Sequence, residues 1–260
     1  MQPVVIKIGG HELEDAALLR EFAVVIRDFA APVIIVHGGG KEISELQQKL
    51  GIEPRYVAGV RITDAPSLAV VEMVLCGIVN KRIVRYLNAA GVDALGLSGI
   101  DRKLIQARQM QNGAEDMGFT GEVTAVRGEV LQSLLQQDVT PVIAPVSYGE
   151  ESAYNVNADH VAGAVAAAVG AESIVFLTNV EGVLRDGQVI PALSVEQTEQ
   201  LIHEGIISGC MIPKVKTALG VLDDGVPQAV ITNLAGLKRG GGTVFTRQPS
   251  ASSHTESERE

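Results

Sequence analysis

The chain has 260 residues, of which 46% are hydrophobic and 20% charged, the composition of an ordinary soluble globular protein. Its formal net charge of −10 argues against a nucleic acid or an anionic membrane as a partner, because both attract basic surfaces. Cys76 and Cys210 lie far apart and match no metal-ligand spacing, so we expect neither a disulfide framework nor a metal centre. No apolar run is long enough to span a membrane and no leader pattern is present, which predicts a cytoplasmic protein.

The first fifty residues alternate between strands and helices. Apolar runs predict strands at Val4–Ile8 and Val33–Val36, and large apolar residues at helical spacing predict a helix over Glu14–Ala30 between them. A polar helix, Lys41–Leu50, follows the glycines after the second strand. This order predicts an α/β protein with a largely parallel sheet.

The middle of the chain combines one long helix with short strands. Thr63 or Asp64 is a suitable N-cap for a helix that runs to Ala90. Its surplus apolar face is either a subunit contact or part of the core. The following short β-like segments, interrupted by glycines, predict a partly antiparallel excursion: Ala94–Leu97, Leu104–Arg108 and Glu122–Val126.

The last part of the chain returns to alternating elements. We expect helices at Glu129–Gln136, Asn155–Val169, Val195–Gly205 and Ile212–Asp223, and strands at Pro141–Ala144, Ser173–Leu177, Ala229–Thr232 and Gly242–Thr246. Residues 248–260 are rich in Ser and Glu without apolar periodicity, which predicts a disordered tail. Residues 1–247 therefore form one predicted domain, with a functional division near residue 150.

Two glycine-rich turns follow predicted strands. Gly9-Gly10 ends the first strand and Gly38-Gly39-Gly40 ends the second. A glycine turn between a strand and a helix exposes backbone N–H groups that can hold an anion. Lys7 lies in an apolar strand near its carboxyl end, where open α/β sheets bind ligands, so we interpret it as ligand-facing rather than as a lysine that reaches solvent from an edge strand.

Three further polar residues are open to two interpretations. Asn155 and Asp159 fall four residues apart and would share a face of the predicted helix, either as an N-cap with a solvated carboxylate or as part of a phosphate site. Lys214 follows a glycine loop at a predicted helix start, where a lone lysine is usually a surface residue. His37 precedes the glycine triplet, and we assign it no chemical role. The P-loop, protein kinase and nucleophile-elbow motifs are absent from the sequence.

Together these motifs make the chain resemble the amino acid kinase family from about Pro3 to Arg247. The segments that carry the resemblance are Ile6–Gly10, His37–Gly40, Gly59–Asp64, Glu72–Leu75, Val79–Lys81, Gly96–Gly99, Gly118–Val123, Asn155–Asp159 and Met211–Lys214. The resemblance implies a three-layer αβα sandwich around a mainly parallel sheet of roughly eight strands. It also implies an amino-acid-binding half, about residues 1–150, and an ATP-binding half, about residues 151–247.

The implied activity is ATP- and Mg²⁺-dependent phosphorylation of the γ-carboxylate of N-acetyl-L-glutamate to an acyl phosphate, in arginine biosynthesis. Matching motif positions imply that Lys7 and Lys214 stabilise the transferring phosphoryl group and that Asp159 orients both lysines. Mg²⁺ would be held mainly by ATP phosphates and water, without a protein metal cage.

The resemblance also implies the substrate contacts. Gly39 and Gly40 would hold the reacting carboxylate through backbone N–H groups, and Arg61 and Asn155 would grip the α-carboxylate. The implied nucleotide contacts are Gly9, Gly10, Asn179, Gly182 and Met211. Two positions depart from the family pattern, because Asn179 replaces a usual aspartate and Cys210 a common glycine.

Two other functions remain open on the sequence. The related kinase of lysine biosynthesis, which acts on α-aminoadipate attached to an acidic carrier protein, fits several motifs nearly as well. A carrier-binding enzyme should have extra basic surface, and the net charge of −10 argues weakly against it. A non-catalytic sensor would be expected to lose Lys7, Asp159 or Lys214, and all three are present. We also expect a homodimer that uses the helix after Asp64.

Overall fold

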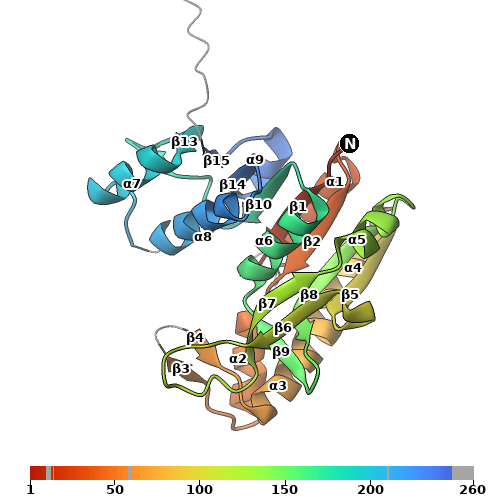
Figure 1. The fold of residues 1–260 in the computed structure, drawn as a ribbon. Coiled ribbons are helices and arrows are strands. Elements are labelled where there is room, and N and C mark those ends of the chain that lie inside the picture. Colours follow the sequence, from red (N-terminus) through yellow and green to blue (C-terminus); the bar gives the residue numbers. More distant parts are fainter. Residues whose placement is uncertain (10–12, 14, 58–59, 210, 248–260) are drawn as a thin grey trace, which may run out of the picture.

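The computed structural model describes residues 1–9, 13, 15–57, 60–209 and 211–247, and a large sheet forms its centre (Figure 1). In spatial order the main strands are β13 (Ala192–Ser194), β15 (Thr243–Thr246), β14 (Gln228–Thr232), β10 (Ser173–Leu177), β1 (Val4–Ile8), β2 (Val33–His37), β8 (Thr140–Tyr148) and β5 (Ala94–Gly99). The expected tail, residues 248–260, lies outside the described residues.

The sheet has 11 strands in the described part of the chain, against the roughly eight implied by the resemblance. The additional strands, which pair with one another and with the end of β8, are β6 (Ile105–Gln109), β7 (Thr120–Val126) and β9 (Ala153–Val156). Antiparallel pairing occurs at β6–β7, β8–β9 and β14–β15, and the other pairs of this sheet are parallel. The mainly parallel sheet is confirmed.

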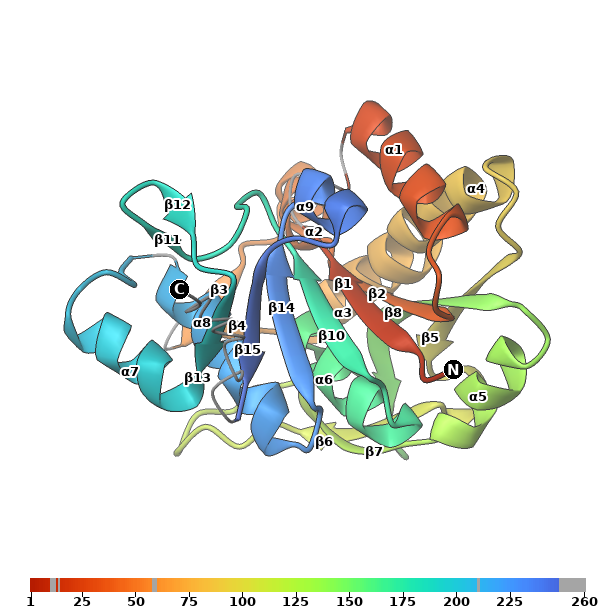
Figure 2. The ribbon, with the colours of Figure 1, turned by 90° about the horizontal axis from the view of Figure 1, so that it is seen from above.

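Helices cover both faces of the sheet (Figure 2). One face carries α1 (Ala16–Arg27), α3 (Ala65–Glu72), the π-helical segment η2 (Met73–Val79), α4 (Asn80–Ala89) and α9 (Leu234–Arg239). The other face carries α5 (Gly128–Leu135), α6 (Ala158–Val169) and α8 (Met211–Asp223), with α7 (Val195–His203) beside β13. The helix α2 (Gly40–Lys49) follows β2 directly. These layers confirm the predicted αβα arrangement.

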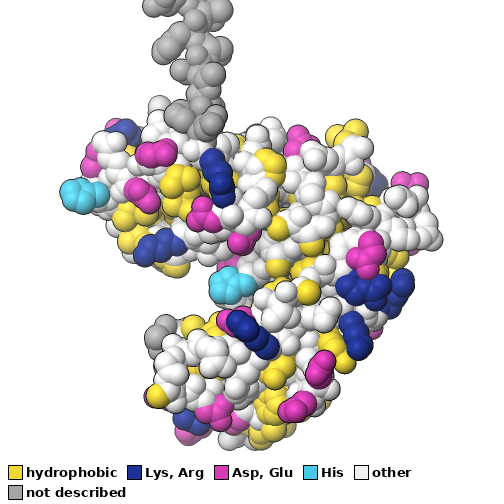
Figure 3. Space-filling view, viewed as in Figure 1, with side chains coloured by type: hydrophobic (Ala, Val, Ile, Leu, Met, Phe, Trp, Pro, Cys, Tyr) yellow, Lys and Arg dark blue, Asp and Glu magenta, His cyan; other side chains and the backbone are white. Residues whose placement is uncertain are grey.

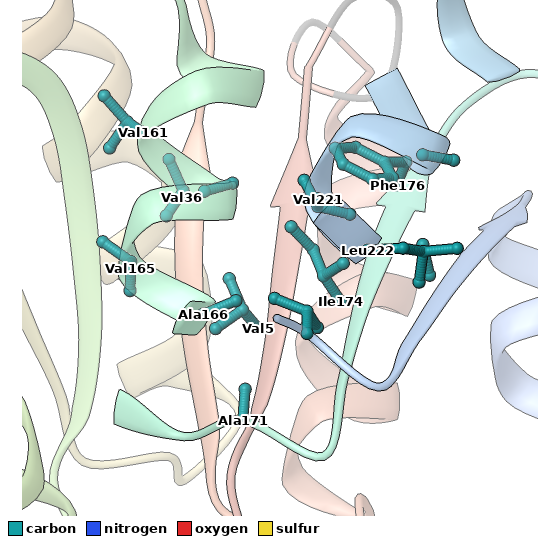
Figure 4. Packing of buried hydrophobic residues seen from close by; sticks show 14 of the residues in the cluster. Val5, Val36, Val161, Val165, Ala166, Ala171, Ile174, Phe176, Val221 and Leu222 are labelled. Atoms are coloured by element: carbon teal, nitrogen blue, oxygen red, sulfur yellow. The ribbon is translucent and has the colours of Figure 1, made fainter. Parts of the chain in front are cut away.

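Two separate apolar clusters hold the layers together. Val5 packs with Val165 of α6 in one cluster, whereas its neighbour Ile6 belongs to the cluster on the opposite face. Figure 4 shows α6 lying over β1 and β2, with α8 beside it over β10. Because successive side chains of a strand point to opposite faces, Lys7 shares the α6 face with Val5. This alternation places a lysine near the first turn of α6.

The long helix after Asp64 is confirmed in extent, from Ala65 to Ala89. Asp64 is its N-cap, with its side chain accepting a hydrogen bond from Ser67 N–H at 2.9 Å. The middle of this helix, η2, has π-helical hydrogen bonding that the apolar periodicity does not predict. The strand after this helix, β5, pairs in parallel with β8, so our expectation of an antiparallel excursion was wrong for Ala94–Leu97. It was right for β6 and β7, which pair antiparallel.

The prediction of a helix from Asn155 was wrong at its start. Asn155 belongs to β9, where its N–H donates to the carbonyl of Phe119, and α6 begins only at Ala158. The N-cap is Asn157, whose side chain accepts from Asp159 N–H at 2.7 Å. Sheet pairing therefore takes precedence over helix extension, and Asn155 and Asp159 do not share a helix face.

Several short elements were not predicted, because each is too short to show a period. They are the hairpin β3 (Arg55–Val57) and β4 (Val60–Ile62), the 3₁₀ turn η3 (Asp101–Lys103), the hairpin β11 (Leu184–Arg185) and β12 (Gln188–Val189), and the elements β13, β9 and α9.

Close contact between α6 and α8 depends on a missing side chain, which gives a test of the packing. A Cβ on Gly163 would lie 2.7 Å from Cγ1 of the buried Val221, whereas a Cβ on Gly220 would meet no atom within 4 Å. Gly163→Val should therefore reduce the free energy of unfolding by about 1–3 kcal/mol through overpacking. Gly220→Ala, the matched control in α8, should raise it by roughly 0.5–1 kcal/mol. Urea unfolding measures both, and equal effects of the two variants would contradict this account.

Candidate active site

A cavity of about 340 Å³ lies where β1, β2 and β8 end and where α2 and α6 begin. Its lining includes Lys7, Gly38, Gly39, Gly40, Arg61, Thr120, Pro145, Asn155 and Asp159. On the face shown in Figure 3, the surface is notched between the part that carries α7 and α8 and the part that carries β3 and β4. The structure thus gathers Lys7, Gly39, Gly40 and Arg61 in one cavity lining, whereas Gly9 is not part of that lining.

An ion pair joins the sheet to α6 beside this cavity. Lys7 Nζ lies 2.9 Å from Asp159 Oδ1, and the two side chains are 20% and 30% exposed. A Cβ on Gly9 would lie only 3.1 Å from Lys7 Nζ, so the ammonium group sits directly against the first glycine turn. A partly exposed pair adds little stability. Its main effect is to hold a positive charge at the end of the strand.

The second glycine turn connects β2 to α2. Gly38 N–H donates to the carbonyl of Ile8 at 2.9 Å, which joins the ends of β2 and β1. Within the described residues, the N–H groups of Gly39 and Gly40 have no hydrogen-bond partner, as is usual at a helix N-terminus. A Cβ on Gly39 would lie 2.7 Å from Leu75 Cδ2, so only glycine fits against η2 here. These donors line the cavity and can bind an anion.

Arg61 and Asn155 approach the cavity from a hydrogen-bonded network. Arg61, on β4, donates to Ser44 Oγ at 2.7 Å and to Gln47 Oε1, both on α2. Asn155 donates to Thr63 Oγ1 at 3.0 Å. Sequence reasoning missed the roles of Ser44 and Gln47, although their spacing of three on a polar helix is a signal that they share a face.

Thr120 links this network to β7. Its hydroxyl donates to the carbonyl of Arg61 at 2.8 Å and accepts from Thr63 N–H at 3.0 Å. Thr120 lies in the segment Gly118–Val123, and sequence reasoning missed its role because its two partners are 57 and 59 residues away in the sequence. The network fixes β4 against β7 and so fixes the approach of Arg61.

His37 is fully buried at the start of the glycine turn. Its Nδ1–H donates to the carbonyl of Gly38 at 2.9 Å, and its Nε2 accepts from Asn80 Nδ2 at 3.2 Å. Burial lowers the pKa of His37 to about 4, and the nearby charge of Lys81 acts in the same direction. The imidazole is therefore neutral at physiological pH.

The predicted nucleotide residues lie apart from this cavity lining. Lys214 is half-buried in the first turn of α8, and among the described residues no ion pair joins it to Asp159. Among the described residues Asp159 pairs with Lys7, and its expected role in orienting Lys214 as well stays a prediction. A groove of about 920 Å³ is lined by β7, α6 and α8, and its lining includes Asp159 and Lys216 but not Lys214.

Three of the remaining predicted residues lie in the C-terminal half, on loops or at a helix start. Asn179 is exposed in the loop after β10, and Met211 begins α8. Gly182 has φ 149°, and a Cβ there would meet Thr243 Oγ1 at 2.6 Å, so packing explains this glycine without a ligand. Gly10 and Cys210 lie outside the described residues.

Neither a metal-binding cluster nor a membrane-spanning helix occurs in the described part of the chain. It contains no group of three or more His, Cys, Asp or Glu side chains that could hold a metal ion. None of its helices is long and apolar enough to cross a membrane.

Comparison with known proteins gives the family. Residues 2–233 match the amino acid kinase family. The chain is 53% identical to an acetylglutamate kinase from Roseiflexus castenholzii, over 92% of each chain, and 48% identical to one from Chloroflexus aurantiacus, over 93% of this chain and 96% of the other. Its fold is similar to N-acetylglutamate synthase from Neisseria gonorrhoeae, with a TM-score of 0.81 and 22% identity over 96% of this chain and 60% of the other. The chain belongs to the amino acid kinase family.

The buried imidazole predicts a pH-dependent stability. The unfolded chain binds a proton at His37 below about pH 6.5, whereas the folded chain binds it only near pH 4, so lowering the pH favours unfolding. The stability is fully present above pH 6.5 and is lost as the pH falls towards 4. Between pH 7.5 and pH 4.5 this contribution should decrease by roughly 2–3 kcal/mol.

The measurement is urea unfolding of the wild type and of His37→Gln at both pH values. The difference in unfolding free energy between them should shrink as the pH falls, because the variant lacks this titration. A difference that stays constant would show that His37 is not held neutral by the fold.

Proposed function

We propose that this enzyme phosphorylates the γ-carboxylate of N-acetyl-L-glutamate with ATP, the second step of arginine biosynthesis. The observation that carries the proposal is the single cavity that gathers Lys7, Asp159, the glycine N–H donors, Arg61 and Asn155. The 45–53% identity to proteins named acetylglutamate kinase over most of the chain supports the same activity. The product is an acyl phosphate, and ADP leaves.

The chemistry follows from charge and position. A γ-carboxylate is ionised at neutral pH, so its oxygen can attack the γ-phosphorus without a general base. Negative charge then spreads over the transferring phosphoryl group, and the protein's task is to stabilise that charge. Lys7 is the cation placed for this by its pair with Asp159. We assign the same role to Lys214 from the nucleotide side.

The amino acid substrate has two carboxylates, and the cavity offers two kinds of donor. We propose that Gly39 and Gly40 N–H groups hold the reacting γ-carboxylate close to Lys7. Arg61 and Asn155 hold the α-carboxylate at the β4 side of the cavity. Binding would exchange the present contacts of Arg61 with Ser44 and Gln47 for a carboxylate, a stronger charge-assisted partner.

The nucleotide belongs to the other half in this proposal. Residues 1–150 would bind the amino acid and residues 151–247 ATP, through Asn179, Gly182, Met211 and Lys214. Gly9 and Gly10, at the end of the first strand, would also contact the nucleotide. Magnesium prefers oxygen ligands and keeps several waters, so ATP phosphates and water would supply most of its ligands. Asn179, with a neutral amide, would position ATP or a metal-bound water without adding negative charge.

We also propose a cytoplasmic homodimer built on the long helix. Met73 and Ile78 of η2 are 52% and 49% exposed, and Leu95 of the neighbouring β5 is 42% exposed. A second copy of this surface would cover them. Sedimentation that finds only monomers would exclude this assembly.

The substrate is tested by coupled ADP release with N-acetyl-L-glutamate, free glutamate and carrier-linked α-aminoadipate. We expect turnover of the first and a hydroxamate-trappable acyl phosphate product. Free glutamate keeps an α-ammonium group that the acetyl amide lacks and should be a much poorer substrate. Turnover of the carrier-linked substrate alone would assign the enzyme to lysine biosynthesis, and no turnover with any of them would favour a sensor.

Lys7→Ala and Arg61→Ala should separate the two roles. Loss of Lys7 removes charge that matters most as the phosphoryl group transfers, so kcat should fall at least about 100-fold. Loss of Arg61 removes a grip that acts alike in ground and transition states, so KM for acetylglutamate should rise about 10-fold or more with a smaller change in kcat. Arg108→Ala, which breaks only an exposed pair with Glu122, is the matched control. An Arg61 variant with unchanged KM and no turnover would contradict this division.

A further inference from the structure

His37 forms a hydrogen bond to the glycine turn through one nitrogen of its ring. Its Nδ1–H donates to the carbonyl oxygen of Gly38 at 2.9 Å. That carbonyl belongs to the peptide unit whose N–H is on Gly39. Because a trans peptide is planar, its C=O and N–H point in opposite directions. The described residues contain no cis peptide, so the bond from His37 fixes where the Gly39 N–H points.

The preceding peptide of the turn is fixed independently. Gly38 N–H donates to the carbonyl of Ile8 at 2.9 Å, so both peptide units that flank Gly38 are anchored. Gly39 lines the cavity, and in the described part of the chain its N–H makes no hydrogen bond. Three glycines in a row would otherwise leave this peptide free to rotate. The side chain of His37 supplies the restraint that the glycines lack.

Asn80 determines which nitrogen of the imidazole carries the proton. Its Nδ2 donates to the carbonyl of Val142 at 2.9 Å and lies 3.2 Å from His37 Nε2. Its Oδ1 accepts from Lys81 Nζ at 3.1 Å, and that ammonium group also donates to the carbonyl of Gly96. The amide is thereby oriented with its NH₂ towards the ring, so Nε2 accepts and the proton stays on Nδ1.

We propose that His37 is a positioning residue that acts on the reaction through the Gly38–Gly39 peptide, with Asn80 and Lys81 fixing its tautomer. The inference rests on the proposed function, in which Gly39 N–H holds the reacting carboxylate. It assigns a role to His37 and Asn80, which the sequence motifs contain but the phosphoryl-transfer scheme does not use. A reacting group held off its line of attack loses rate even when it still binds.

The competing explanation is that His37 only fills space under the turn. Two variants separate these possibilities, because the amide nitrogen of asparagine can take the place of Nδ1, and the amide oxygen of glutamine can take the place of Nε2 as the acceptor for Asn80. His37→Asn keeps a donor for Gly38 and loses the partner of Asn80. His37→Gln is the larger side chain, keeps the far contact and loses the donor. The two variants therefore separate the effect of a donor beside Gly38 from the effect of side-chain volume.

The kinetic test is kcat for acyl phosphate formation in both variants, with the melting temperature as a measure of folding. A positioning role predicts that kcat of His37→Asn is about tenfold or more above kcat of His37→Gln, with KM for ATP unchanged in both variants. Equal kcat values, or a faster His37→Gln enzyme, would overturn the proposal.

A second measurement uses the wild-type protein without substrate. Long-range ¹H–¹⁵N NMR distinguishes the two imidazole tautomers, and the signal of His37 is the one lost in His37→Asn. We expect the Nδ1–H tautomer at pH 7. An Nε2–H tautomer would overturn the role of His37 while leaving the proposed function standing, and failure of the wild type to phosphorylate acetylglutamate would remove that function while leaving the hydrogen-bond chain intact.

Discussion

The site depends on one interaction, the pair between Lys7 on the central strand and Asp159 on the first turn of α6. Strand alternation carries Lys7 to the α6 face, and the apolar contacts of Val5 with α6 fix the distance between the two elements. Asp159 lies at the amino end of a helix, where a carboxylate is stabilised by the helix dipole. The pair therefore joins sheet, helix and cavity at one point. The position of the ammonium group is set by the packing beneath the pair.

Absent side chains matter as much as the charged ones. Gly39 lets η2 pack directly against the turn, and Gly163 lets α6 approach α8. In both places a methyl group would meet a buried branched side chain at 2.7 Å. The first contact sets the position of the N–H donors, and the second sets the position of α6 and hence of Asp159. Small residues thus transmit the packing of both helix layers to the cavity.

Much of the fold could be predicted from the sequence. The strands Val4–Ile8 and Ser173–Leu177 have the predicted limits, because they are short, largely buried and mainly apolar runs. Hairpins such as β3–β4 were missed, since three-residue strands carry no period. The helix start at Asn155 was placed too early because pairing of β9 with β7 depends on contacts between residues that are far apart in the sequence.

The same reasoning explains which parts of the site could be found. Lys7, Gly39 and Asp159 follow or precede sharp local signals: the end of a strand, a glycine run and the start of a helix. Ser44 and Gln47 had only the signal of a shared helix face, and Thr63 and Thr120 had no local signal for their role. All four hold Arg61 or Asn155 through hydrogen bonds across the fold. His37 was assigned no role for a related reason. Its burial and its two partners are properties of the fold alone.

The overall charge gives these local arrangements their physical purpose. A chain with a formal net charge of −10 repels ATP and a dicarboxylate at long range, so attraction must come from within the cavity. Lysine and arginine side chains are flexible, so holding their charges in place costs rotamer entropy. Backbone N–H groups at the start of α2 add partial positive charge without side-chain entropy, provided that their peptides cannot rotate. An acidic kinase of this kind therefore needs a rigid glycine turn more than it needs additional cations, and rigidity at Gly38 comes from the backbone of Ile8 and the ring of His37.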